Sequence, residues 1–152
     1  MPAFNIAAAV IPREARRTYK VPGLPGFELE LAPMTKANRA YWSEFLTIVT
    51  AWHASGGVDE ELDEASEVRY RRRDAELMAK HVVTGWAGVT NAAGEPVPFT
   101  SQAARDFLLE LATTEGAEHL FDGIRAFAKE PSNFTGGALA ASKALAGNSA
   151  GG

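Results

Sequence analysis

Three ionisable side chains in the last third of the chain are the clearest candidates for metal or acid–base chemistry. Glu115, His119 and Asp122 stand at positions i, i+4 and i+7, which share one face if the segment is a single helix. Carboxylates and imidazoles are common ligands of divalent metals. The same spacing is also typical of a charged, solvent-facing helix surface, and we favour that interpretation. We therefore predict no metal site, and a metal-dependent enzyme stands as an alternative hypothesis.

A second chemically suggestive segment reads RYRRR at residues 69–73. An aromatic ring among arginines is a pattern that phosphate and nucleic-acid sites use. Acidic residues flank the run on both sides, and the net charge of −4 argues against neutralisation of a phosphate backbone. We predict that this part of the chain is a solvated face or contacts another protein, and a DNA-binding regulator is the less favoured alternative. The predicted contact residues are Tyr70, Arg71, Arg72 and Arg73.

Other routes to catalysis have no support in the sequence. The chain contains no cysteine, which excludes thiolate catalysis, disulfides and iron–sulfur clusters. No GxSxG, HExxH, GxGxxG or Walker motif is present. The acidic run at 59–64 lacks the spacing and the glycine of a calcium loop and suits a helix N-terminus better. We predict no catalytic residue and no cofactor.

The composition suits one globular domain. The chain has 152 residues, of which 46% are hydrophobic and 22% charged. No apolar run approaches the roughly 20 residues that a membrane span requires, so no membrane partner is expected. We predict a mainly α protein with about four helices and an N-terminal β-hairpin, divided into an arm at 1–13, a helical domain at 14–130 and a flexible Gly/Ala-rich tail at 131–152. The arm is expected to be either disordered or an extra strand.

The elements that must position these residues follow from periodicity and turn chemistry. Alternating segments at 17–21 and 27–31, joined by PGLPG, predict the hairpin. A first helix should begin after an N-cap at Thr35. Its stripe at three- and four-residue spacing should lie in the core; it consists of Tyr41, Phe45, Ile48, Val49 and Trp52.

Three further helices are expected. The second starts near residue 59 and carries the i,i+4 pairs Glu67–Arg71 and Glu76–Lys80. The third covers about 101–112, with Thr100 or Ser101 as its cap, and the fourth follows residues 113–114 and ends at Pro131. Small residues dominate what remains, which predicts a flexible tail that could become helical on a partner.

The stretch GWAGVTNAAGEPVPFT at residues 85–100 places a tryptophan between glycines. We predict that Gly85 ends the second helix and that Gly88 lets the backbone pass close to another element. The apolar residues of the stretch should then fill a gap between the second and third helices, and we favour such packing over a binding role. The motif residues are Gly85, Trp86, Gly88, Val89, Gly94, Val97, Pro98 and Phe99.

These motif residues, together with Thr100, lie in a run that resembles the tail assembly chaperones of long-tailed phages and related prophages. In that family a helix ends in a valine-rich turn, followed by GWxGV, a polar loop with a glycine, and VPF[ST] opening the next helix. Residues 79–110 carry this pattern, and the outline of the resemblance covers about 14–134. Asn91 and Ala92 depart from it, because an acidic loop residue is expected there.

The resemblance implies a non-enzymatic role in the host cytoplasm. Such chaperones bind the tape measure protein, keep its long helices soluble and recruit tail tube subunits during assembly. The candidate contact surfaces for such a partner are the Tyr70–Arg73 side of the second helix and any part of the 41–52 stripe that stays exposed. The resemblance leaves self-association open. A structural virion protein, such as a head–tail connector or a minor tail component, is the alternative hypothesis.

Overall fold

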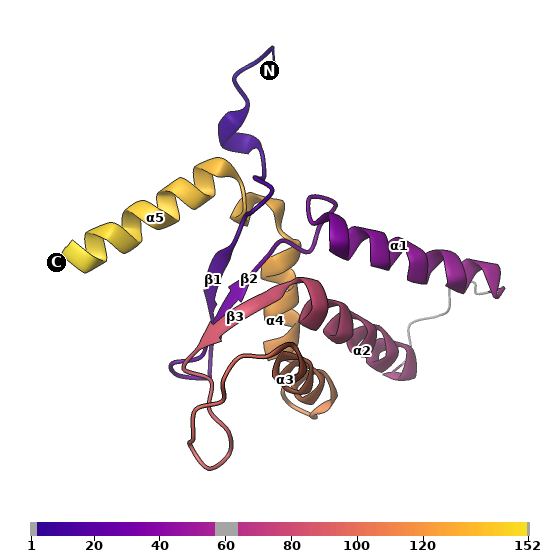
Figure 1. The fold of residues 1–152 in the computed structure, drawn as a ribbon. Helices are drawn as coiled ribbons and strands as arrows, with labels where there is room; N and C mark the ends of the chain where they lie inside the picture. The colour runs from indigo at the N-terminus through magenta and orange to yellow at the C-terminus, as the bar shows by residue number, and fades with distance from the viewer. Residues whose placement is uncertain (1–2, 57–63, 152) are drawn as a thin grey trace.

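The computed structural model describes residues 3–56 and 64–151. Helices dominate, and a small antiparallel sheet lies beside them (Figure 1), so the predicted mainly α class is confirmed. The elements in chain order are η1 (Ala7–Ala9), β1 (Arg17–Lys20), β2 (Glu28–Leu31), α1 (Arg39–Ala54), α2 (Glu64–His81), β3 (Val83–Ala87), α3 (Ser101–Thr113), α4 (Glu118–Lys129), η2 (Pro131–Asn133) and α5 (Gly136–Gly151).

The sheet has three strands in the order β1-β2-β3, all antiparallel. The hairpin of β1 and β2 confirms the prediction, but β3 was not predicted. Instead of leaving regular structure, the chain passes from α2 into β3, where Trp86 pairs with Leu29. Leu29 also pairs with Tyr19, so these three side chains form one row across the sheet.

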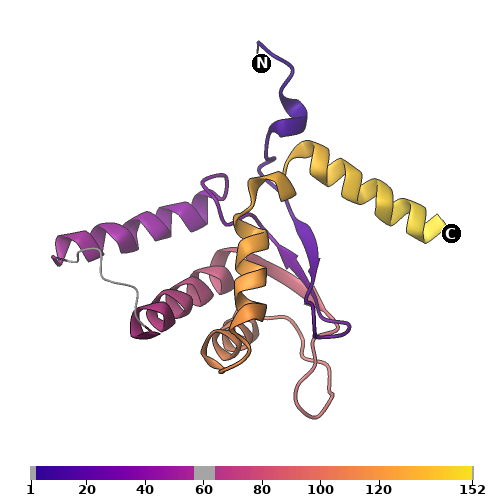
Figure 2. The ribbon, with the colours of Figure 1, turned by 180° about the vertical axis from the view of Figure 1, so that it is seen from behind.

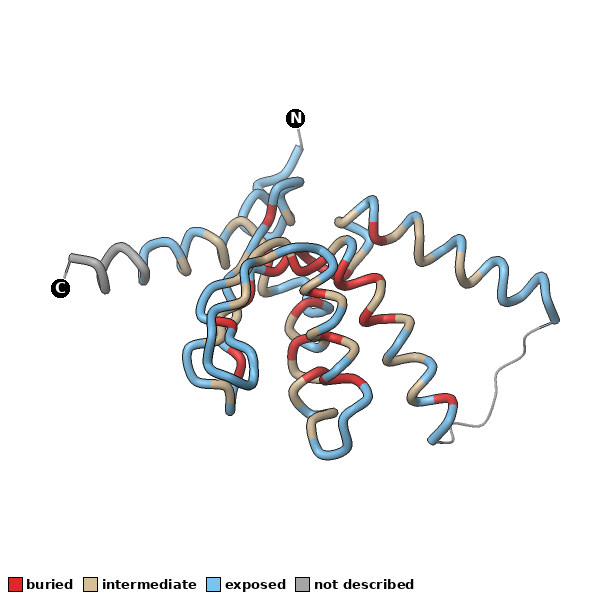
Figure 3. The backbone as a smooth tube through the Cα atoms, turned by 60° about the horizontal axis from the view of Figure 1, so that its bottom comes forward, coloured by how far each residue is buried: buried red, intermediate tan, exposed pale blue. Residues whose placement is uncertain are grey.

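That row faces the helices and forms part of the core. Tyr19 meets Phe127 of α4 with ring centroids 5.0 Å apart, and Trp86 meets Phe107 of α3 at 5.9 Å. Figure 2 shows α4 crossing one face of the sheet. The other packed layer is formed by α2 and α3, through buried residues such as Met78 and Leu108. Figure 3 shows that the buried residues gather where these helices and the sheet meet.

Helix α1 lies beside α2 and at the margin of this core. Its N-cap is Asn38, whose side chain accepts a hydrogen bond from the Tyr41 backbone N–H, so the prediction of Thr35 was wrong. Of the expected buried stripe only Tyr41 is buried, and Trp52 is 41% exposed. The stripe was predicted as core because periodicity reports only which residues share a face, whereas α2 covers just the first turns of that face.

Helices α3 and α4 agree with the sequence. Thr100 caps α3 by accepting a hydrogen bond from Ala103 N at 2.9 Å. Phe121, Ile124 and Ala128 are the buried residues of α4, on the face predicted for it. Helix α2 is described from Glu64, so its expected start near residue 59 and the apolar Leu62 lie outside the described residues.

The N-terminal arm contacts the start of α5 at one side of the domain. Gly136 N, at the start of α5, donates to Val10 O at 2.8 Å, just after η1. A Cβ atom on Gly136 would lie 2.9 Å from Ala7 O, so glycine permits this contact. The arm therefore holds a short 3-10 helix rather than a strand, and the tail forms helix α5, which extends away from the body (Figures 1 and 2). The domain boundaries and the mobility of the tail stay predictions.

Candidate functional site

The four residues predicted to contact a partner point in different directions around α2. Arg71 donates from Nε and Nη2 to the carboxylate of Asp122 on α4, at 3.3 and 3.2 Å. Arg73 donates from Nε and Nη2 to Oδ1 of Asp74. Arg72 is exposed, as is Arg69 at the start of the run. Two of the three arginines therefore serve the fold, and the run is not one continuous surface.

Asp74 is the centre of an ion-pair network that joins α2 to α4. Its side chain is 2% exposed, and Arg125 Nη1 donates to its Oδ2 at 2.9 Å. Lys129 Nζ stands 4.0 Å from the same oxygen. Arg125 also reaches Asp122 at 3.0 Å, which links Asp74 to the Arg71 pair. A buried carboxylate requires such partners, so this network is structural.

Ion pairs between helices replace one of the predicted pairs along α2. The Glu67–Arg71 pair is present at 3.9 Å. Glu76 instead binds Arg105 of α3 at 2.8 Å, and Lys80 binds Glu44 of α1 at 2.7 Å. The predicted Glu76–Lys80 pair was wrong because neighbouring helices offer each residue a partner.

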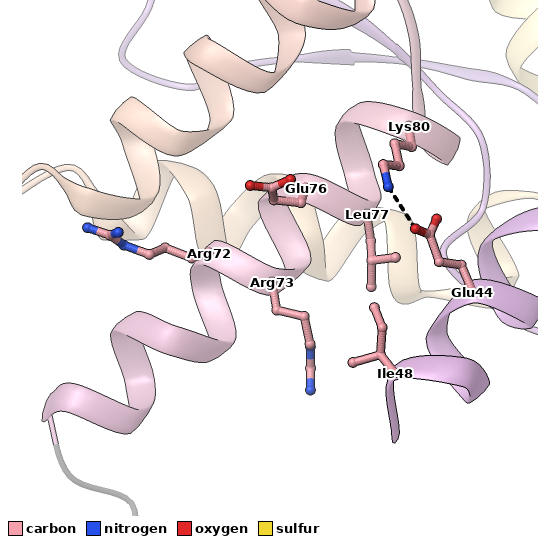
Figure 4. Close-up of a pocket in the computed structure, with 7 residues that line it drawn as sticks. All are labelled: Glu44, Ile48, Arg72, Arg73, Glu76, Leu77 and Lys80. Carbon is pink, nitrogen blue, oxygen red and sulfur yellow. Dashed lines mark hydrogen bonds and ion pairs between the residues drawn. The ribbon is translucent and has the colours of Figure 1, made fainter. Parts of the chain in front are cut away.

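The seam between α1 and α2 contains two adjoining hollows. The first has a volume of about 330 Å³, with Ile48 and Leu77 facing each other across it (Figure 4). The Lys80–Glu44 ion pair closes one end, and Glu44 Oε2 is also hydrogen-bonded to His81 Nε2. The hydrogen bond from Lys80, and then that from His81, hold the pKa of Glu44 below its ordinary value. At this end of the seam, Glu44 therefore links α1 to Lys80 and His81 of α2.

The second hollow, hereafter the α1–α2 groove, lies further along α1 and shares Ile48 and Arg73 with the first. It also has a volume of about 330 Å³. Its lining consists of Ile48, Val49, Trp52 and His53 from α1 and of Arg69, Tyr70 and Arg73 from α2. The groove therefore combines aliphatic and aromatic surface with cationic side chains.

Arg73 forms the junction between the two helices in this groove. Its guanidinium carbon lies 5.5 Å from the ring centroid of Phe45 and 5.2 Å from that of Tyr70. Arginine over aromatic faces is a favourable cation–π arrangement. The contact joins Phe45 of α1 to Tyr70 of α2, while Trp52 in the groove keeps 41% of its surface in solvent.

The indole of Trp86 is half-buried and packs against the core, which agrees with the predicted packing role. Nε1 donates to Val97 O at 2.8 Å, and the ring meets Phe99 edge-on at 5.3 Å. With the Phe107 contact, these interactions join β3 to the loop before α3 and to α3 itself. The predicted position between the second and third helices was wrong, because the unpredicted strand carries the indole onto the sheet.

The remaining motif residues support this loop. Gly88 has φ +73°, and a Cβ there would lie 1.9 Å from Gly26 O in the β1–β2 turn. The predicted close backbone approach is therefore confirmed. Gly94 has φ +79° in the turn after Asn91, and Gly85 lies within β3 rather than at the end of α2. Val89 is buried, Val97 and Phe99 are half-buried, and Pro98 is exposed.

The candidate metal cluster is not assembled. Glu115 lies in the turn before α4, so it does not share a helix with His119 and Asp122. The Asp122 oxygens are bound to arginines. Within residues 3–56 and 64–151, no group of three or more His, Asp or Glu side chains could hold a metal ion. In the same part of the chain, no helix is long and apolar enough to cross a bilayer.

Two features of the site escaped the sequence analysis. Asp74 looked like one more member of a charged run, although a carboxylate between Arg73 and the apolar Ala75 signals a possible buried pair. The groove itself was not predicted, because the α1 stripe was expected to lie mainly in the core and only an exposed remainder of it was considered as a contact surface. The low charge of α1 was the available signal, since Arg39 and Glu44 are the only Asp, Glu, Lys or Arg residues in this helix.

Comparison with known proteins gives one informative result. A family model described as YdaY prophage protein matches residues 37–144, which include helices α1 to α4, strand β3 with Trp86, and the α1–α2 seam. No curated protein and no solved structure matches the chain. The match covers more than half of the chain, and the chain therefore belongs to the YdaY prophage protein family.

Proposed function

We propose that the chain is a tail assembly chaperone that binds the tape measure protein and recruits tail tube subunits during tail morphogenesis. The proposal combines membership of a prophage family with the GWxGV…VPFT resemblance of residues 79–110. The observation that carries it is the aromatic and aliphatic side of α1 beyond Tyr41, which no other described element covers fully.

The physical basis is helix-in-groove recognition. Long apolar helices aggregate unless their apolar faces are covered. Helix α1 offers Ile48, Val49 and Trp52 beside Tyr70 of α2, and such a surface suits an amphipathic helix with anchors at i, i+3 and i+4. None of these four side chains is buried, and of the four only Ile48 packs against the core of the described residues.

Co-expression with the tape measure protein of the same prophage tests the proposal. We expect the soluble yield of that long helical protein to rise several-fold and the two proteins to copurify. A control co-expresses the tape measure protein with an unrelated soluble protein of similar size and charge. Unchanged solubility and no copurification would contradict the chaperone function.

The composition of purified particles separates this function from a structural role. A chaperone acts during assembly and should be absent from mature particles or present far below the stoichiometry of tail subunits. A fixed stoichiometric amount in washed particles would instead establish a connector or minor tail component.

A further inference from the structure

Three arginines line one hollow where the N-terminal arm passes the start of α1 (Figure 1). This hollow, hereafter the basic hollow, has a volume of about 420 Å³, and its arginines are Arg13 and Arg16 from the segment before β1 and Arg39 of α1. The described residues that line it include no Asp or Glu, although the chain carries a net charge of −4. It shares no lining residue with the α1–α2 groove, so the two are separate surfaces.

The fold does not neutralise these three arginines. Within the described part of the chain, the side chains of Arg13 and Arg39 form no ion pair and no hydrogen bond. The guanidinium of Arg16 donates one hydrogen bond there, from Nη1 to the adjacent Ala15 O at 2.7 Å. Glu14, the nearest acidic residue in sequence, does not line the hollow. All three arginines are exposed, so most of their N–H donors are available to a ligand.

Stability of the fold does not explain this arrangement. Arg39 is the first residue of α1, and the first turn of that helix contains no acidic residue. The helix dipole is positive at its N-terminus and favours a carboxylate there, so an arginine adds repulsion. Cations gathered around one hollow also repel one another unless an anion lies between them. A bound anion would remove both unfavourable interactions.

From these observations we propose that the basic hollow binds an acidic segment of a partner protein, which places side-chain carboxylates between Arg13, Arg16 and Arg39. Arginine pairs with a carboxylate through two parallel N–H···O hydrogen bonds. Ile11 and Pro33 also line the hollow, so part of its wall is apolar. Its volume lies within the range that binding pockets commonly occupy, ~300–1,000 Å³. The inference goes beyond the proposed function and does not rest on it.

The charges of the chain favour this occupant over two others. The affinity of a nucleic acid grows with the number of phosphates neutralised along the strand. Three arginines around a single hollow, on a chain of net charge −4, offer one local contact and no such track. A two-fold pair of chains is also unsuitable, because a symmetric interface would place the arginines of one copy against the same arginines of the other.

Fluorescence anisotropy tests the inference with the full chain and labelled probes at low salt. The first probe is a peptide with a run of glutamates between glycine and serine residues, and the second has glutamine at each of those positions. The third is a single-stranded oligonucleotide with the same net charge as the first. We expect the glutamate peptide to bind at least about tenfold more tightly than either other probe. Its affinity should fall as sodium chloride is added, because salt screens exposed charges.

Variants of the hollow give the second arm of the test. Arg13→Glu and Arg39→Glu should each weaken binding of the glutamate peptide at least about tenfold, because hydrogen bonds to charged groups are among the stronger ones. Arg72→Glu is the matched control: it makes the same charge change at an exposed residue of α2 that does not line the hollow, so its affinity should equal that of the wild type. Thermal unfolding should show that Arg39→Glu is at least as stable as the wild type, because a carboxylate suits the helix N-terminus.

Several results would overturn the inference. These are equal binding of the glutamate and glutamine peptides, no binding of either, or an equal loss of affinity in Arg72→Glu, which would show a response to net charge alone. Tighter binding of the oligonucleotide that is lost in Arg39→Glu would assign the hollow to phosphates instead.

Sedimentation of the chain without probes addresses a second copy as the occupant. The wild type and Arg39→Glu should sediment alike. Self-association that Arg39→Glu abolishes would overturn the inference and assign the hollow to an acidic segment of another copy. The solubility assay with the tape measure protein tests the proposed function separately, so the two can fail independently.

Discussion

Replacing Gly88 with alanine tests the packing of the tryptophan motif against the hairpin. The residue has φ +73°, and a Cβ would stand 1.9 Å from Gly26 O and 2.8 Å from Gly26 C. Both are backbone atoms, so no side-chain rotation relieves the overlap. Either the β1–β2 turn or the end of β3 must move, and the second movement would displace Trp86 from Phe99 and Phe107.

The expected magnitude has two parts. A non-glycine residue in the left-handed region costs about 1–2 kcal/mol. Displacing backbone that is packed on both sides adds to this, and we expect a total loss of about 3–5 kcal/mol, at the upper end of single-residue effects. Because the free energy of unfolding of a small domain is about 5–15 kcal/mol, this loss would remove a large part of the stability of the chain at room temperature.

Two other glycines of the motif provide matched controls. Gly94→Ala meets nothing within 4 Å but keeps φ +79°, so it should lose only about 1 kcal/mol. Gly85→Ala lies in β3 with ordinary contact to Glu30 Cβ at 3.8 Å, and it should be neutral or stabilise by about 0.5 kcal/mol. Urea unfolding followed by fluorescence and circular dichroism measures all three. If Gly88→Ala falls within about 1 kcal/mol of Gly94→Ala, the close approach to Gly26 is not present in solution.

Three further predictions concern the ion pairs and the indole. Asp74→Asn should lower the free energy of unfolding by about 2–4 kcal/mol, because its partly exposed cationic partners lose a buried carboxylate; Asp106→Asn, on an exposed face of α3, should change it by less than about 0.5 kcal/mol in the same urea titration. The lowered pKa of Glu44 means that its stabilising contribution is present above its unfolded pKa, near 4.5, and is lost as the pH falls through the folded value. The melting temperature should therefore fall less steeply between pH 6 and 3 in Glu44→Gln than in the wild-type chain. Parallel curves of melting temperature against pH would contradict the Lys80–Glu44–His81 contacts. Trp86→Phe keeps an apolar ring but leaves Val97 O without its donor, which should cost about 1–2 kcal/mol by chemical denaturation.

Local patterns determined most of the helical architecture. The turn PGLPG, the cap at Thr100 and the apolar face of α4 each depend on residues close in sequence, and each is present as predicted. The close approach of Gly88 was also predicted, because glycine has no Cβ and is suited to positions where one backbone passes close to another. Strand β3 was not, since a five-residue segment with a central glycine gains its stability from pairing with β2.

Tertiary structure decided which side chains bind other residues of the chain and which stay on the surface. The sequence marked residues 70–73 as one charged run, yet α4 binds Arg71, Asp74 binds Arg73, and Arg72 stays exposed. The sequence also indicated that the α1 stripe lies in the core. Helix α2 covers only the first turns of that stripe, so Trp52 reaches solvent beside two arginines. Periodicity and charge fix the character of each helix face, and only the packing of α1, α2 and α4 against one another determines what that face meets.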